Sequence, residues 1–113
     1  MRVLLVLLLV VLTSLAGATT AGAAAKRCGT VDVDVSGDPY TKARDIRARG
    51  ASCRKARTVA RAAGALAHDG SFALRFKARR FTCKGVEEYG AVYAVHYTCR
   101  RDAARIRFRM SAS

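Results

Sequence analysis

The sequence predicts a small α+β domain stapled by disulfides, in which one helix packs on an antiparallel sheet of three to five strands. Three observations lead to this fold class. The chain contains four cysteines, apolar and polar residues alternate in several segments, and one segment has the periodicity of a helix. A chain of this size buries a modest core, so covalent cross-links would add stability that the core does not supply.

The first 25 residues have the pattern of a secretory signal peptide. A positively charged start precedes an unbroken apolar run over residues 3–12 and a stretch of small neutral residues, with Ala23-x-Ala25 as the expected cleavage site. The apolar run has about ten residues, whereas a membrane span needs roughly 20. We therefore expect a signal peptide at 1–25, a single secreted domain at 26–113, and no membrane span after cleavage.

Export would place the domain where cysteines pair and remain paired. The cysteines are Cys28, Cys53, Cys83 and Cys99. A hairpin turning near Gly90 or Ala91 would place Cys83 opposite Cys99, at a spacing that suits a disulfide. By elimination Cys28 would pair with Cys53, and a Cys53–Cys83 bridge is the alternative. The spacings contain no C-x2-C pair, so we expect no metal site and no cofactor.

The elements before the helix are a strand, a turn and an ambiguous segment. Residues 30–35 alternate valine with polar residues, which predicts a half-buried strand. Residues 36–39 include the proline of this chain and predict a turn. Residues 40–49 fit either a helical turn or a short strand.

The clearest element is a helix from Cys53 to Leu66, with Ser52 as its N-cap and a stop at residues 68–70. Its apolar face comprises Cys53, Ala56, Val59, Ala60, Ala63 and Leu66. The helix is also cationic, as membrane-active helices are, but a face made mostly of alanine favours packing against a sheet.

The second half of the domain predicts antiparallel strands. Residues 71–76 alternate again, and residues 77–80 form a basic connection to the cysteine hairpin. The expected core side of the hairpin comprises Phe81, Cys83, Tyr93, Val95, Tyr97 and Cys99. Residues 101–104 predict a turn, and residues 105–110 predict a last strand with apolar residues inside and arginines outside.

Short cysteine motifs carry a family resemblance. Gly50 to Ala60 reads GASCRKARTVA, and the later cysteines stand in Phe81-Thr82-Cys83 and Tyr97-Thr98-Cys99-Arg100. These motifs resemble those of small secreted actinobacterial proteins with two disulfides. The resemblance implies a secreted disulfide domain and assigns neither an activity nor catalytic residues.

The domain after residue 25 is strongly basic, with 20 lysine and arginine residues against eight acidic residues and a net charge of +12. Such a field attracts polyanions, including nucleic acid and anionic cell-wall polymers, without selecting among them. The alternative interpretation is a solvated surface whose arginines reflect genome composition.

Arg105, Arg107 and Arg109 form the sharpest part of this pattern, because strand spacing would place them on one face about 7 Å apart. The alternative is an edge strand that charge protects from aggregation. Arg54 and Lys55, on the helix, are the other candidate anion-binding residues.

Catalysis has less support. His96 and Glu88 could act as base and acid, with Arg107 stabilising charge, in phosphodiester cleavage of the kind that small secreted ribonucleases perform. The sequence contains no phosphate-binding glycine loop, no G-x-S-x-G motif and no metal-ligand cluster, and the disulfides would use every thiol. We therefore expect a non-enzymatic extracellular domain that binds an anionic partner or another protein, with a ribonuclease-type hydrolase as the alternative.

Overall fold

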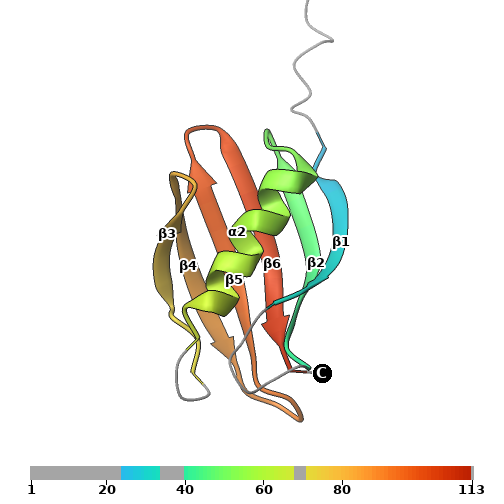
Figure 1. The fold of residues 1–113 in the computed structure, drawn as a ribbon, viewed down its shortest axis with the longest axis vertical. Coiled ribbons are helices and arrows are strands. Elements are labelled where there is room, and N and C mark those ends of the chain that lie inside the picture. The colour runs from blue at the N-terminus through green and yellow to red at the C-terminus, as the bar shows by residue number, and fades with distance from the viewer. Residues whose placement is uncertain (1–23, 34–39, 68–70, 113) are drawn as a thin grey trace, which may run out of the picture.

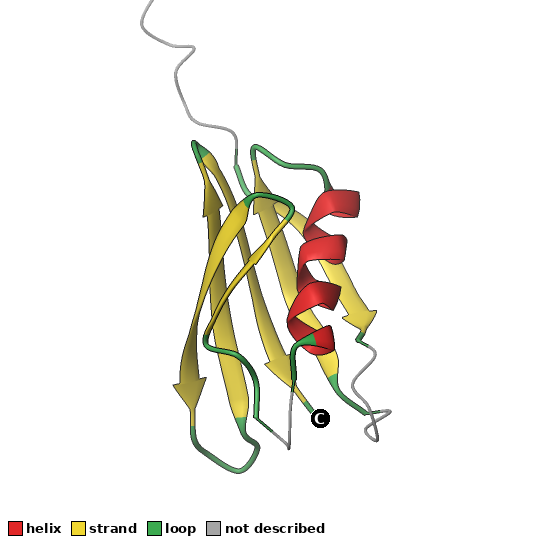
Figure 2. Cartoon of the chain, turned by 60° about the vertical axis from the view of Figure 1, so that its left-hand side comes forward, coloured by secondary structure: helices red, strands yellow, loops and turns green. Residues whose placement is uncertain are grey.

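The computed structural model describes residues 24–33, 40–67 and 71–112. Its elements are β1 (Lys26–Asp32), β2 (Lys42–Arg49), α2 (Cys53–Ala65), β3 (Arg75–Ala78), β4 (Phe81–Glu88), β5 (Ala94–Arg101) and β6 (Ala104–Ser111). The strands of this part of the chain form one six-stranded antiparallel sheet in the order β1-β2-β6-β5-β4-β3. The helix lies across one face of the sheet and leaves the other face uncovered (Figures 1 and 2).

The predicted α+β class with one helix on an antiparallel sheet is confirmed, but the predicted three to five strands are too few. The ambiguous segment at residues 40–49 contributes a complete strand, β2, between β1 and β6. Ala43, Ile46 and Ala48 on this strand are fully buried. This segment is a strand because it pairs with β1 on one side and with β6 on the other. The local pattern of apolar residues does not reveal such long-range pairing, so the sequence left the choice between helix and strand open.

Several predictions concern residues outside the ranges that the structure describes. The predicted signal peptide lies almost entirely outside the described residues, as do the end of the first predicted strand, the turn at residues 36–39 and the helix stop at residues 68–70. Across the described ranges, no helix combines the length and the apolar character that crossing a membrane requires.

The helix begins where the sequence predicts. The hydroxyl of Ser52 accepts the backbone N–H of Lys55 at 3.1 Å, so Ser52 is the N-cap. The helix ends at Ala65, one residue before the predicted Leu66, whose side chain is exposed rather than part of the buried face. Gly64 lies against Val33 so closely that a Cβ would stand 2.5 Å from the valine Cβ. A helix that contacts the sheet through alanine and glycine can pack unusually near it.

Both disulfides join the cysteines that the sequence favoured. Cys83 and Cys99 face each other directly across β4 and β5, with Cα atoms 4.0 Å apart. Cys28 on β1 is bonded to Cys53, the first residue of α2, with Cα atoms 5.1 Å apart. The predicted pairing is confirmed and the Cys53–Cys83 alternative is wrong. In the loop-entropy description each bridge stabilises the fold by about 3 kcal/mol.

Tyr97 on β5 is a fully buried aromatic residue of the core. Its ring stacks on Phe108, with centroids 5.0 Å apart, and meets Phe76 edge-on at 5.5 Å. Its hydroxyl donates a hydrogen bond to the carbonyl of Ala73 at 2.7 Å. Burial raises the pKa of this phenol well above its ordinary value. The hairpin residues predicted to face the core do so, although Tyr93 is only partly buried.

The last strand is not at an edge. β6 pairs with β2 on one side and with β5 on the other, so it lies in the interior of the sheet. The interpretation of Arg105, Arg107 and Arg109 as protection for an edge strand is therefore wrong. Their charge must be explained in another way.

The absence of a side chain at Gly85 lets Val95 and Tyr97 pack directly against β4. A substitution at this position tests that packing. A Cβ at this position would lie 2.6 Å from Val95 Cγ1 and 2.9 Å from Tyr97 Cε1. We expect Gly85→Ala to lower the free energy of unfolding by about 1–3 kcal/mol through overpacking, measured by urea denaturation. Gly90→Ala is the control, because a Cβ there would meet nothing within 4 Å. Equal losses in the two variants would contradict this description of the core.

Candidate anion-binding face

The face of the sheet that α2 leaves uncovered is dominated by basic side chains; we call it the helix-free face. Strand alternation buries every second residue beneath α2 and turns the residues between them to the opposite side. The basic strand residues on this face are Arg27, Lys42, Arg44, Arg47, Arg49, Arg75, Lys77, Lys84, Arg100, Arg105, Arg107 and Arg109.

Strand register aligns many of these residues into rows that cross the sheet. The first basic row consists of Arg49, Arg105, Arg100, Thr82 and Lys77, on β2, β6, β5, β4 and β3. The second basic row consists of Arg27, Arg47, Arg107, Thr98, Lys84 and Arg75, and crosses all six strands. Neighbouring positions in a row are about 5 Å apart, and the rows are about 7 Å apart. Every position in these two rows is therefore occupied by a basic residue or by threonine.

Arg105 shows the electrostatic consequence of this arrangement. The positive charge of Arg100 lowers the pKa of Arg105, and partial burial, Arg107 and Arg49 act in the same direction. The Nε atom of Arg105 is buried and has no hydrogen-bond partner among the described residues. An unpartnered buried donor is uncommon in native proteins. No ion pair of the described residues involves any of these four arginines.

A bulge in β2 places a carboxylate among the arginines. Arg44 pairs with Arg109 and Arg47 with Arg107, so Asp45 and Ile46 together oppose one residue of β6. The bulge resets the alternation, which turns Ile46 into the core and leaves Asp45 exposed. The backbone of Asp45 has a left-handed φ of 52°, a conformation that aspartate tolerates better than most residues.

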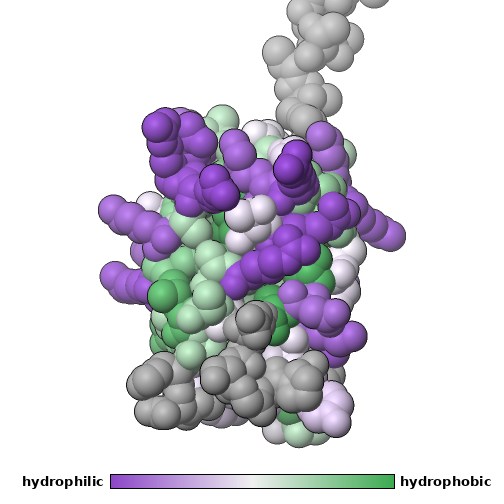
Figure 3. All heavy atoms as spheres, in the orientation of Figure 1, coloured by the Kyte–Doolittle hydropathy of each residue, from purple (hydrophilic) through white to green (hydrophobic). Residues whose placement is uncertain are grey.

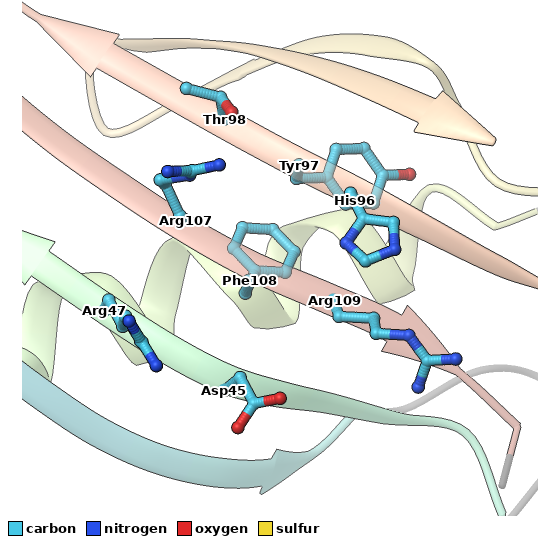
Figure 4. A pocket seen from close by; sticks show the side chains of 8 residues that line it. All are labelled: Asp45, Arg47, His96, Tyr97, Thr98, Arg107, Phe108 and Arg109. Atoms are coloured by element: carbon cyan, nitrogen blue, oxygen red, sulfur yellow. The ribbon is translucent and has the colours of Figure 1, made fainter. Parts of the chain in front are cut away.

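A hollow of about 320 Å³ lies beside this bulge, across β2, β6 and β5. Figure 4 shows Asp45 and Arg47 on β2, Arg107 and Arg109 on the adjacent β6, and His96 on β5. The residues that line the hollow are Asp45, Arg47, His96, Tyr97, Thr98, Arg107, Phe108 and Arg109. Guanidinium groups, an imidazole, a hydroxyl and a carboxylate thus share one shallow site, which suits an anionic ligand that also carries a hydrogen-bond donor.

The predicted acid–base pair does meet on the helix-free face. His96 Nε2 contacts Glu88 Oε2, and Arg109 lies 3.9 Å from the other carboxylate oxygen of Glu88. The hydrogen bond from His96 lowers the pKa of Glu88, and the charges of His96 and Arg109 lower it further. Glu88 is therefore a carboxylate near neutral pH and is poorly suited to the role of proton donor that the sequence suggested. Arg109, rather than Arg107, is the arginine next to this pair.

The five predicted anion-binding residues do not form one site. Arg105, Arg107 and Arg109 lie on the helix-free face, whereas Arg54 and Lys55 lie on α2, in the opposite layer. On the helix side of the molecule, hydrophilic residues lie next to hydrophobic surface (Figure 3). Arg54 and Lys55 line a separate depression of about 290 Å³ with Ser52, Thr58 and Arg79.

An aromatic cluster on the helix side forms around a second carboxylate. The hydroxyls of Tyr89 and Tyr93 both donate to Glu87 Oε2, at 2.6 and 2.7 Å, and lower the pKa of Glu87. Burial and the bond to Glu87 raise the pKa of Tyr93 to about 12. These mutual hydrogen bonds satisfy the cluster, and it lies outside both basic rows.

Sequence reasoning missed several members of the face. Arg47 and Arg49 belong to the segment whose structure was ambiguous, Arg100 follows a cysteine, and Asp45 is exposed through a bulge. One signal could have identified two of them. Arg47-x-Arg49 has the same two-residue spacing as Arg105-x-Arg107, which places the guanidinium groups of each pair on one strand face.

Comparison of the chain with protein-family models, with curated proteins and with solved structures gives no match. Within the described residues no group of three or more histidine, cysteine, aspartate or glutamate side chains could hold a metal ion. The function must therefore be argued from the geometry of the helix-free face.

The His96–Glu88 contact predicts a pH dependence of stability. Because the pKa of Glu88 is lower in the folded protein than its ordinary value of 4.5, the carboxylate stabilises the fold above that pH and the contribution is lost as pH falls below it. We expect the melting temperature of Glu88→Gln to lie below that of the wild type at pH 7 and to converge with it on acidification.

Asp102→Asn is the matched control, because Asp102 lies in the exposed β5–β6 turn and takes part in no ion pair of the described residues. Its melting temperature should remain close to that of the wild type throughout the titration. A gap between Glu88→Gln and the wild type that widens in acid would contradict the role given to Glu88.

Proposed function

We propose that this protein is a secreted, non-enzymatic domain that binds an anionic extracellular polymer through the helix-free face of its sheet. The observation that carries the proposal is the cluster of Arg49, Arg100, Arg105 and Arg107 on three adjacent strands, without an ion pair among the described residues. Same-sign charges at this spacing destabilise the unbound protein, and an anion that bridges them removes that cost.

Three further features support the proposal. The two disulfides suit an oxidising compartment such as the extracellular space. The arginines stand on interior strands, where protection of a sheet edge does not account for their charge. Two rows at regular spacing also suit a ligand with repeating charges better than a single small anion.

Two double variants with the same change in net charge test which face binds. Arg105→Gln/Arg107→Gln removes two charges from the helix-free face, and Arg54→Gln/Lys55→Gln removes two from α2. Each variant is titrated with a fluorescent nucleic-acid duplex and with heparin across a range of salt concentrations. We expect the first variant to bind at least tenfold more weakly and to show a salt slope smaller by about two, since each lost phosphate contact reduces the slope by about 0.9.

The α2 variant should bind nearly as well as the wild type. Equal losses in the two variants would show that net charge alone drives binding and would overturn the assignment to the helix-free face. Absence of binding to every polyanion at low salt would overturn the function itself, and a protein partner would then be the better hypothesis.

A second candidate function, phosphodiester hydrolysis, is favoured by the contact between His96 and Glu88 beside Arg109. In this candidate the carboxylate of Glu88 would act as the base that takes the proton from a ribose 2′-hydroxyl. The oxygen would attack phosphorus, the bond to the 5′-oxygen would break, and His96 would protonate that oxygen. Arg109 would stabilise the charge on the phosphate.

Turnover of a fluorogenic dinucleotide distinguishes this candidate from simple binding. A hydrolase would lose turnover in His96→Ala while retaining most of its affinity for RNA. The binding function that we favour requires no turnover in the wild type, so cleavage that depends on His96 would replace it by the second candidate.

A further inference from the structure

The hollow beside the β2 bulge contains a feature that attraction of polyanions by positive charge does not explain. Asp45 is a carboxylate placed among Arg47, Arg107 and Arg109, and no ion pair of the described residues involves it. A surface that attracted polyanions by net charge would bind better without it, because the carboxylate repels phosphate.

The exposed position of Asp45 depends on a specific local structure, the bulge in β2. The bulge exposes a residue that regular alternation would bury next to Ala43, and the backbone of Asp45 adopts a left-handed φ of 52°. A β-bulge redirects a single side chain, and bulges are over-represented next to functional sites. Asp45 is therefore a candidate for direct contact with the ligand, as an acceptor for a hydroxyl or amino group.

The other side chains of the face restrict where on the ligand that donor lies. Every aromatic residue of the six strands is buried on the helix side: Phe76, Phe81, Tyr97 and Phe108. Proteins that bind single-stranded nucleic acid stack bases on exposed aromatic rings, and the strands of this face offer none. A nucleic acid on this face would therefore be contacted through its backbone.

Among nucleic acids, backbone recognition together with a hydrogen-bond acceptor favours RNA over DNA. The 2′-hydroxyl of ribose is the hydrogen-bond donor that an RNA backbone has and a DNA backbone lacks. Double-helical RNA displays these hydroxyls between phosphates in a wide, shallow minor groove, which side chains on a sheet face can reach. Thr98, which also lines the hollow, adds a neutral hydroxyl between Arg107 and Lys84 in the second basic row.

We propose that the helix-free face binds the backbone of double-helical RNA, with Arg47, Arg107 and Arg109 on phosphate oxygens and Asp45 accepting a ribose 2′-hydroxyl. The proposal rests on the function proposed above and names its ligand. Anionic wall polymers and DNA share the phosphate chemistry, but the deoxyribose backbone of DNA gives Asp45 no donor.

Asp45→Asn tests the proposal because it should have opposite effects on the affinity for RNA and on the affinity for duplexes without a 2′-hydroxyl. Asparagine has nearly the same shape and tolerates the same left-handed backbone, so the fold should be retained, and circular dichroism and the melting temperature check this. Affinity is measured for three duplexes of one sequence: RNA, its 2′-O-methyl derivative and DNA. The 2′-O-methyl duplex retains RNA-like geometry but has no hydroxyl donor.

We expect Asp45→Asn to weaken binding to the RNA duplex roughly tenfold, as loss of a charged hydrogen bond does. The same variant should bind the 2′-O-methyl and DNA duplexes a few-fold more tightly, because a repulsive charge has been removed. Tighter binding to all three duplexes would overturn the role of Asp45 while leaving anion binding by the face intact.

Two further outcomes separate the ligand class from the general function. Tighter binding of the wild type to a poly(glycerol phosphate) than to the RNA duplex would overturn the assignment to RNA and favour a wall polymer. Failure of every duplex and polymer to bind at low salt would overturn both this proposal and the function on which it rests.

Discussion

The division of the sheet into an apolar face beneath one helix and a basic face without a helix is the constraint on which the rest of the structure depends. Two-residue alternation in β5 and β6 enforces this division, because each buried residue is followed by a residue on the opposite side. Tyr97 and Phe108 therefore determine the core, while His96, Thr98 and Arg107 must face away from it. The core cannot be assembled without bringing the arginines of the neighbouring strands together.

Stabilising contacts on the helix side of the sheet offset the repulsion between the same-sign charges of the helix-free face. The Cys83–Cys99 bridge locks the register of β4 against β5, and the Cys28–Cys53 bridge ties β1 to the start of α2. Gly64 and Gly85 let the helix and the aromatic rings approach the sheet closely, and a methyl group at either position would collide with a neighbour. A covalently stapled, tightly packed layer thus supports a face whose side chains repel one another.

Local patterns predicted much of this fold, and long-range pairing accounts for what they missed. Ser52 and the stripe of alanines predicted the helix, and alternation around Gly90 predicted both the hairpin and the Cys83–Cys99 bridge. The position of β6 in the middle of the sheet could not be predicted, because strand order depends on which distant segments pair. The arginines of β6 were recognised from their spacing within one strand. Arg49 was missed because its place next to them, on β2, depends on the pairing of distant segments. Asp45 escaped prediction because nothing in an Arg-Asp-Ile-Arg run marks the bulge that exposes the carboxylate.

Nuclear magnetic resonance of the arginine side chains tests most directly whether the helix-free face is the anion-binding surface. The Nε–Hε signals of labelled protein are followed while an RNA duplex is added at low salt. We expect early changes for Arg47, Arg105 and Arg107, and in particular for the Nε of Arg105, which has no hydrogen-bond partner among the described residues. The signals of Arg57 and Arg61 on α2 should change little. Changes confined to the arginines of α2, or equal changes at every arginine, would contradict it.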